Sequence, residues 1–238
     1  MSFPATQQSV LKRIRSGDPE VRRAAFGDLA VGYWRPSYHY VRLHWQLGPD
    51  AAEDAVQGFF ATAFEKGYLE RYDPSKARFR TFLRTCLDRF VQNRHKAERA
   101  LKRGGETTLL SLDFPGAERE LDAVAARDLG DLDRFFHDET VRSLFARTVD
   151  AMRETYAREG RQIVFDVFER HDLQPTPDMS YRRVADELHL TTSQVTNHLH
   201  AARKRFRELA LANLRALVGT DEEFHQEARE LFGLELDS

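Results

Sequence analysis

The stretch Ser180–Leu209 reads SYRRVADELHLTTSQVTNHLHAARKRFREL and predicts two amphipathic helices joined by a tight turn. Apolar residues recur at helical spacing in each half, at Tyr181, Val184, Ala185 and Leu188 and then at Val195, Leu199, Ala202 and Phe206. Thr191 and Gln194 have the spacing of a capping box, and Leu190 and Val195 have that of a hydrophobic staple. Two short helices held at a fixed angle in this way form the frame of a helix-turn-helix.

The polar face of the second helix carries short polar side chains first and cations after them. This order suits a helix that reads base edges and holds phosphates in the major groove of DNA. The residues predicted to contact duplex DNA are Thr192, Ser193, Gln194, Thr196, Asn197, His198, Arg203 and Lys204. The competing interpretation is a surface helix whose cations answer the negative end of the helix dipole. The capped turn and the polar face occur together, which favours DNA binding.

The pattern Ser-Tyr-x-x-Val-Ala-x-x-Leu-x-Leu-x-x-x-x-Val-x-x-x-Leu-His-x-Ala-Arg runs from Ser180 to Arg203. It resembles the second DNA-binding domain of bacterial RNA polymerase sigma factors, most closely the compact extracytoplasmic-function (ECF) group. The resemblance implies that this domain reads the duplex of the −35 promoter element. His198 stands where many relatives carry arginine, and a neutral imidazole would hold phosphate less well. We therefore expect weaker or pH-dependent affinity at that position.

Length and composition set the broad class of the protein. The chain has 238 residues, which suits one or two small domains, and its formal net charge is −2. A single cysteine, Cys86, cannot form a disulfide framework or a cysteine-based zinc site. No apolar run approaches the ~20 residues that span a membrane, and the N-terminus lacks a signal peptide's hydrophobic region. Nearly every long segment has helical periodicity, so we expect a cytoplasmic, all-α protein.

Residues 19–45 predict two helices separated by Pro36, because proline lacks the backbone N–H that a helix interior needs. The first runs through Val21, Ala25, Leu29 and Tyr33, and the second bears Tyr40, Val41, His44 and Trp45. His39 and His44 lie close in sequence, but no cysteine or carboxylate has a suitable spacing beside them. We therefore expect no metal site and no cofactor.

The stretch Gly48–Gly67 predicts a helix with a wide apolar face. Its run Asp-Ala-Ala-Glu-Asp-Ala-Val-Gln-Gly-Phe-Phe resembles the sigma segment that docks on the clamp helices of core RNA polymerase. Asp54, Gln57 and Gly58 lie largely off the apolar face, and the resemblance implies that they contact the polymerase. Side-chain chemistry alone leaves a solvated face as an equal alternative.

Residues 76–103 concentrate positive charge, with ten basic residues against two acids, a net +8. A basic helix beside a loop suits a surface that tracks a single DNA strand. An anionic membrane is a weaker alternative, since the apolar face is needed for the core. The residues predicted to hold such a strand, which the sigma resemblance implies is that of the −10 promoter element, are Lys76, Arg78, Arg80, Arg84, Arg89, Asn93 and Lys96.

The sigma resemblance extends to this basic stretch, which matches the segment that opens the −10 element. It implies a base pocket formed by Arg71–Arg78 with Phe79 and Phe82, although the spacing of these aromatics favours core packing. Arg89 and Asn93 differ from the residues common in relatives, namely asparagine and aspartate, which puts the preferred base in doubt.

Two acidic segments follow. Residues 104–139 hold ten acids against three arginines, a net −7, and predict a solvated linker with a short helix around Ala117–Val124. An acidic chain could alternatively occupy a basic polymerase channel by charge mimicry. Residues 219–238 hold seven acids and Arg229, a net −6, and predict one amphipathic helix. We expect this extension to cap the C-terminal domain, with inhibition of a basic recognition surface as the alternative.

The predicted organisation is therefore two helical domains joined by an acidic linker. Residues 1–104 form a sigma region-two-like domain, 105–138 the linker, 139–218 a region-four-like helix-turn-helix domain and 219–238 the extension. The resemblance implies core RNA polymerase and promoter DNA as partners, and in some relatives an anti-sigma protein. The alternative is a helix-turn-helix regulator that binds DNA without polymerase. No phosphate loop or nucleophile elbow is present, so we expect no catalytic activity.

Overall fold

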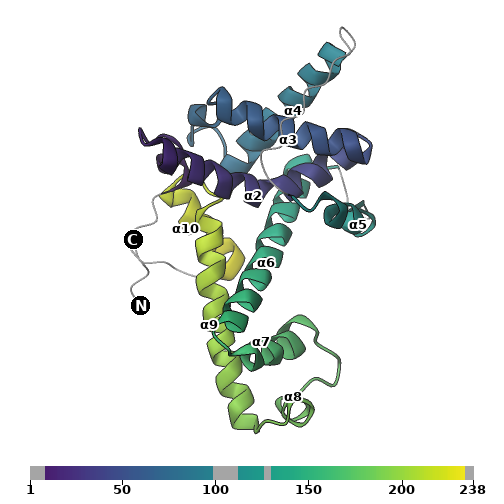
Figure 1. Ribbon diagram of the computed structural model, residues 1–238, viewed down its shortest axis with the longest axis vertical. Helices are drawn as coiled ribbons and strands as arrows, with labels where there is room; N and C mark the ends of the chain where they lie inside the picture. The colour runs from purple at the N-terminus through teal and green to yellow at the C-terminus, as the bar shows by residue number, and fades with distance from the viewer. Residues whose placement is uncertain (1–8, 99–111, 126–129, 234–238) are drawn as a thin grey trace. The chain divides into compact units, whose positions relative to one another are not determined.

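The computed structural model describes residues 9–98, 112–125 and 130–233, and every regular element within these ranges is helical (Figure 1). The elements are α1 (Val10–Ile14), α2 (Pro19–Leu43), α3 (Pro49–Glu65), the 3₁₀ turn η1 (Leu69–Arg71), α4 (Phe79–Glu98), α5 (Phe114–Ala125), α6 (Leu132–Arg158), α7 (Gln162–Phe168), the π-helical turn η2 (Glu169–Leu173), α8 (Tyr181–Leu188), α9 (Thr192–Arg215) and α10 (Asp221–Phe232). The prediction of an all-α protein is confirmed.

The chain divides into two compact units. The first unit comprises residues 1–143 and 214–238, and the second comprises residues 144–213. Helices α6 and α9 each contribute residues to both units. The first unit therefore holds the predicted strand-binding helix together with α5 and α10, and the second holds the helix-turn-helix.

Helix α2 is continuous through Pro36, so the predicted break at this residue is wrong. Asp18 caps the helix by accepting hydrogen bonds from the backbone N–H groups of Glu20 and Val21. An interior proline costs about 3 kcal/mol in a helix. Residues on both sides of Pro36 are buried, including Tyr33 and Tyr38. We attribute the continuity to this burial, since a break would expose one half of the helix.

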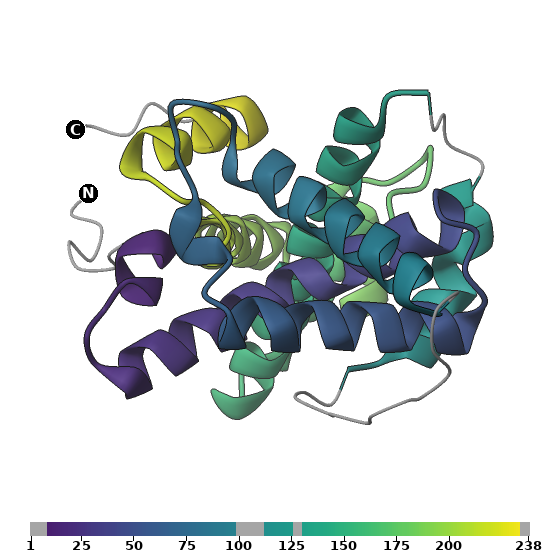
Figure 2. The ribbon, with the colours of Figure 1, turned by 90° about the horizontal axis from the view of Figure 1, so that it is seen from above.

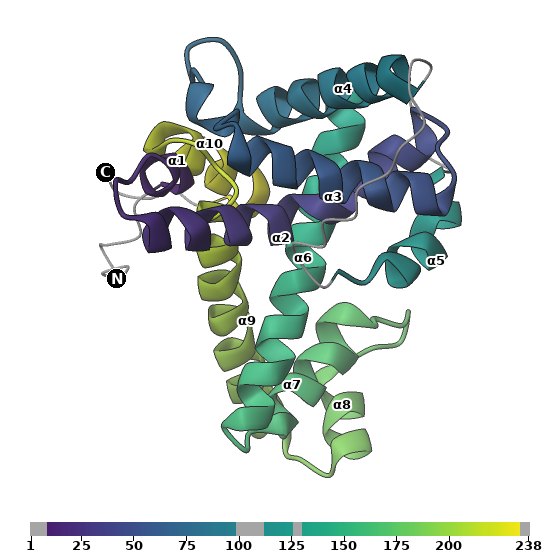
Figure 3. The same cartoon turned by 45° about the horizontal axis from the view of Figure 1, so that its top comes forward.

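Helices α2, α3 and α4 form the body of the first unit (Figure 3). Phe59 and Phe60 of α3 are buried, as are Leu83 and Leu87 of α4. Buried residues recur at helical spacing along each helix, as at Ala52, Val56 and Phe59 of α3, so each helix presents one apolar face to the core. The predicted role of the apolar stripe on α4 as core is confirmed at Leu83 and Leu87.

Part of the predicted acidic linker is a docked helix rather than a solvated chain. The aromatic ring of Phe114 on α5 lies 5.1 Å from the ring of Trp34 on α2, measured between centroids. Glu118 accepts hydrogen bonds from the Tyr38 hydroxyl at 2.6 Å and from the Arg42 Nε at 2.9 Å. Arginines of α2 therefore neutralise acids that the sequence pattern predicts to be exposed to solvent. The short helix predicted at Ala117–Val124 is present within α5, and residues 105–111 and 126–129 lie outside the described ranges.

A buried ion pair ties α5 and α6 to α2. The Nδ1 atom of His39 lies 2.8 Å from Oε2 of Glu139, and its Nε2 lies 3.0 Å from the carbonyl oxygen of Ala117. The Nη2 atom of Arg142 lies 3.3 Å from the same Nδ1 and donates to Oε2 of Glu139 at 2.9 Å, so the three side chains form one buried polar network. Burial opposes ionisation of Glu139, but hydrogen bonding from His39 and the charge of Arg142 hold the pKa of its carboxyl below the usual value. His39 therefore has a structural role in this fold.

Candidate nucleic-acid interface

The turn between α8 and α9 has the capping geometry that the sequence predicts. The Oε1 atom of Gln194 accepts a hydrogen bond from the backbone N–H of Thr191 at 2.8 Å. In return, the hydroxyl of Thr191 accepts one from the backbone N–H of Gln194 at 3.2 Å. Two residues before Thr191, His189 ends α8 in the left-handed conformation with φ of 54°. The reciprocal bonds fix where α9 begins and confirm the predicted capping box.

Apolar side chains beneath the turn fix the angle between α8 and α9. Val184 and Ala185 of α8 pack with Val195 and Leu199 of α9 in one buried cluster. Leu190 packs against the same cluster, so both members of the predicted staple, Leu190 and Val195, contribute to it. With its apolar side buried in this way, α9 presents its polar side to solvent.

The predicted duplex-reading residues lie mostly on the exposed side of α9. Thr192, Ser193, Thr196, Asn197 and Lys204 are exposed, and His198 is half-buried. The Gln194 side chain is also exposed, but its carbonyl oxygen is bound in the capping box, which leaves the amide nitrogen for any base contact. Ser193, Asn197 and Lys204, with His200 and Arg207, recur at helical spacing and form one polar-to-basic row, the α9 row.

Arg203 differs from the other predicted DNA contacts, because its guanidinium is held within the second unit. Its Nε and Nη2 atoms donate to the carboxylate of Asp172 at 2.7 and 2.8 Å. Hydrogen bonding to Asp172 raises the pKa of Arg203. Burial opposes ionisation of Asp172, but bonds from Arg203 and His171 hold the pKa of its carboxyl below the usual value. Asp172 lies in the π-helical turn η2, and no local motif marks its pairing with Arg203, so this residue was not predicted from the sequence.

The predicted strand-binding residues on and before α4 fall into two groups. Lys76, Arg89, Asn93 and Lys96 are exposed. Arg78, Arg80 and Arg84 are instead paired with acids of the first unit. Arg89, Asn93 and Lys96 lie at i, i+4 and i+7 and therefore share one face of α4, here called the α4 row. Arg99, Lys102 and Arg103, which add to the basic charge of this segment, lie outside the described residues.

The aromatic residues beside the start of α4 belong to the core. Phe79 is fully buried, and the centroid of its ring lies 5.1 Å from that of Tyr72. The ring of Phe82, which is half-buried, lies 5.4 Å from Tyr72. In this arrangement the ring of Phe79 is inaccessible to a stacking base.

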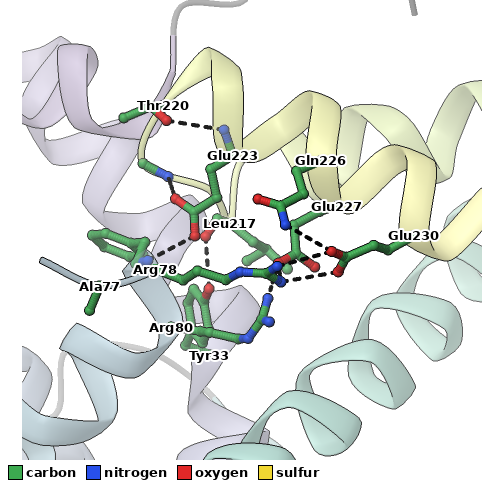
Figure 4. Close-up of polar contacts among 12 residues, drawn as sticks. Tyr33, Ala77, Arg78, Arg80, Leu217, Thr220, Glu223, Gln226, Glu227 and Glu230 are labelled. Carbon is green, nitrogen blue, oxygen red and sulfur yellow. Dashed lines mark hydrogen bonds and ion pairs between the residues drawn. The ribbon is translucent and has the colours of Figure 1, made fainter. Parts of the chain in front are cut away.

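Acidic residues of α10 occupy the arginines at the start of α4 (Figure 4). Glu227 contacts Arg78 Nη1 at 2.8 Å and also pairs with Arg80. Glu230 binds Arg78 through both of its oxygens, at 2.9 and 3.0 Å. Glu223 accepts a hydrogen bond from the backbone N–H of Phe79 at 2.8 Å. The C-terminal extension thus packs on the strand-binding helix, and the expectation that it caps the C-terminal domain is wrong.

Two residues of α6, Asp133 and His137, lie near arginines of α4. Asp133 accepts a hydrogen bond from the Nε of Arg84 at 2.9 Å, and Asp88 of α4 contacts the same guanidinium at 2.8 Å. Burial lowers the pKa of His137, and the charge of Arg80 lowers it further. His137 is therefore held neutral beside the arginines and adds no positive charge to them.

The predicted polymerase-contacting residues are partly engaged within the first unit. Asp54 is exposed and lies 3.5 Å from Nη2 of Arg94 on α4. The Nε2 of Gln57 donates to Glu53 at 3.2 Å. A Cβ at Gly58 would lie 3.3 Å from Cζ of Phe90, so glycine lets α3 and α4 approach closely at this point. Gly58 thus has a packing role, and Asp54 is the most exposed of the three.

None of the helices in the described ranges combines the length and apolarity needed to cross a bilayer. The same ranges contain no cluster of three histidine, cysteine or acidic side chains placed to bind a metal ion. Comparison of the chain with protein families, curated proteins and solved structures finds no match. Any functional conclusion therefore depends on the geometry of the two candidate surfaces, the α4 row and the α9 row.

Proposed function

We propose that the protein is a sigma factor of the ECF type, which binds core RNA polymerase in the cytoplasm and directs it to promoters. The observation that carries this proposal is the α9 row, a polar-to-basic face on the second helix of a capped helix-turn-helix. The order of the segments along the chain, with a basic helix first and a duplex-reading helix later, supports it. The proposed role is binding and positioning of DNA rather than catalysis.

The second unit is proposed to read duplex DNA. Ser193 and Asn197 are short polar side chains near the N-terminus of α9, where a recognition helix meets base edges. Lys204 and Arg207 lie further along the same row and would contact phosphates. Arg203 supports this surface indirectly, by tying α9 to η2 through Asp172.

The first unit is proposed to hold one strand of the opened duplex. The α4 row offers the cations Arg89 and Lys96 with the amide of Asn93 between them. Cations two turns apart on one face of a helix can contact phosphates of a single strand, and the amide between them can hydrogen-bond a base edge. Arg78 and Arg80 would extend this surface toward the start of the helix once their acidic partners leave.

Docking on core polymerase is proposed to involve Asp54, because its carboxylate remains largely exposed with 68% side-chain accessibility. A regulator that binds duplex DNA without polymerase is the second candidate. This candidate is favoured because Gln57 bonds Glu53 and Gly58 packs against Phe90, so these contacts explain both residues without a contact to polymerase. An anti-sigma protein is a further proposed partner that depends on the sigma assignment.

Co-elution of the purified chain with bacterial core RNA polymerase tests the proposal. We expect the full chain to co-elute, and the double variant Asp54→Ala/Gln57→Ala to bind more weakly. Glu65→Ala is the matched control, because Glu65 is an exposed acid on the same helix, and it should bind like the unmodified chain. If neither the full chain nor a version ending at residue 218 co-elutes, the stand-alone regulator becomes the better account.

A further inference from the structure

Helix α10 and the start of α4 meet through charged groups. Three consecutive residues, 78–80, supply the donors: two guanidinium groups and one backbone N–H. The acceptors are the carboxylates of Glu223, Glu227 and Glu230, which face these donors together (Figure 4). In Figure 2, α10 and the start of α4 lie beside each other at one end of the first unit.

The buried face of α10 is unusual for a helix that only completes a core. Its fully covered residues are Glu223, Glu227 and Ala228, whereas its large apolar residues, Phe224, Leu231 and Phe232, are only half-buried. An ordinary amphipathic helix buries its apolar residues and leaves its acids in water. The buried acids of α10 are held by Arg78, Arg80 and two backbone N–H groups, and another polyanion can replace the ionic part of these contacts.

The groups that α10 contacts are suited to phosphate. A guanidinium binds carboxylate and phosphate oxygens with the same forked geometry. The side chain of Arg80 retains only 15% of its accessible surface, and that of Arg78 retains 32%. A DNA strand therefore cannot reach Arg80 fully while α10 is in place.

We propose that α10 is a built-in competitor of single-stranded DNA: Glu227 and Glu230 occupy Arg78 and Arg80, and must leave before a strand binds along the whole of α4. This inference rests on the proposed strand binding by α4. Glu223 and the hydrogen bond from the Tyr33 hydroxyl to the carbonyl of Leu217, at 2.7 Å, hold the base of α10. The base can stay attached while the outer acids are exchanged for phosphates.

The competition predicts a measurable change in affinity. If the open form is about a tenth of the population, the apparent Kd for a strand is raised about tenfold, because only the open form binds fully. The variant Glu227→Gln/Glu230→Gln removes two negative charges and keeps side chains of similar shape. We expect it to bind a fluorescently labelled single-stranded oligonucleotide about tenfold more tightly than the unmodified chain, measured by anisotropy at fixed salt.

The control Glu20→Gln/Glu65→Gln makes the same change in net charge at exposed acids of α2 and α3, outside the ion pairs of Arg78 and Arg80. It should change the affinity far less. Adding Arg78→Ala/Arg80→Ala to the Glu227→Gln/Glu230→Gln variant should abolish the gain, because the released donors are then absent. An equal gain in the charge control would overturn the proposal, since it would show a general charge effect.

Hydrogen exchange on the unmodified chain gives a second readout that needs no variant. Adding the oligonucleotide should speed amide exchange in residues 221–232, and unchanged exchange there during binding would overturn the inference. If Arg89→Ala/Lys96→Ala weakens strand binding but Glu227→Gln/Glu230→Gln leaves it unchanged, strand binding stands and the competitor fails. If no form of the chain binds the oligonucleotide, the proposed strand capture fails together with the inference.

Discussion

Arg80 on α4 forms an ion pair with Glu227 on α10 across 147 positions of the sequence. The pair joins the most basic segment of the chain to its acidic extension. It is almost fully covered, since the side chain of Glu227 retains 4% of its accessible surface. The extension is therefore a part of the first unit, and it covers residues that the sequence predicts to bind DNA.

Gly219 allows α10 to approach Tyr72 closely, and its replacement should loosen the helix. A Cβ at this position would lie 2.4 Å from Cε1 of Tyr72, so the buried ring or the backbone of Gly219 must shift to make room. We expect Gly219→Ala to lower the free energy of unfolding by about 1–3 kcal/mol. Gly27→Ala is the control, because no atom lies within 4 Å of the added carbon, and it should not destabilise the chain. Urea unfolding of both variants checks the prediction, and equal free energies of unfolding for Gly219→Ala and Gly27→Ala would contradict it.

Glu118 should remain ionised in unusually acidic solution. The hydrogen bond from Arg42 outweighs burial and lowers the pKa of this carboxyl from 4.5 to about 2. Because the folded pKa lies below the unfolded value, the stabilisation is present above pH 4.5 and is lost as the pH falls toward 2. Carboxyl NMR titration should show this low pKa, and Arg42→Met should return it toward 4.5. A normal pKa in the unmodified chain would mean that α5 is not docked on α2.

The buried pair of His39 and Glu139 should be strongly coupled. Their side chains retain 0% and 1% of their accessible surface. Glu139→Met leaves the buried His39 ring and the guanidinium of Arg142 without their carboxylate partner, so it should cost about 3–5 kcal/mol. The double variant His39→Leu/Glu139→Met should cost less than the sum of the two single changes, because neither buried polar partner is then left without the other. Chemical denaturation of the four forms gives the coupling energy, and additive costs would refute the pairing.

Substitutions at Thr191 and Ser193 should have different effects, the first on stability and the second on DNA binding. Thr191→Ala removes the hydroxyl that caps α9 and should cost about 1 kcal/mol, seen as a lower Tm in calorimetry. Ser193 is exposed and outside the capping box, so Ser193→Ala should change stability by less than about 0.5 kcal/mol. If α9 reads DNA, Ser193→Ala should still weaken binding to a selected duplex site. Equal losses of stability in the two variants would argue against the observed turn geometry.

Lys204 and Arg203 are neighbours with different expected roles. Lys204→Ala should weaken duplex binding at all sequences and reduce the slope of log Kd against log salt by about one, because one phosphate contact is lost. Arg203→Ala should instead destabilise the second unit by about 1 kcal/mol, since its ion pair with Asp172 is partly exposed. Binding measured across a salt series, together with unfolding curves, distinguishes the two. If Arg203→Ala reduced the salt slope as Lys204→Ala does and left stability unchanged, the assigned role of Arg203 would be contradicted.

Local sequence patterns were sufficient to predict the all-α class and the turn between the two helices of the helix-turn-helix. The bonds between Thr191 and Gln194 span three positions, and the apolar residues of α8 and α9 recur with the helical period. Such features depend on neighbours in the chain, so their physical causes can be recognised without a fold. The same reasoning located the basic segment and both acidic segments.

Only the tertiary structure decided where the charges meet. Pro36 is tolerated because packing on both sides of it outweighs a lost hydrogen bond, and Glu118 is neutralised by an arginine on another helix. The pairing of Arg80 with Glu227 likewise joins segments whose spacing carries no periodic signal. The sequence by itself determined which segments are helical and how each is charged. Which charges lie in contact depends on long-range packing, because ion pairs have no fixed separation along the chain.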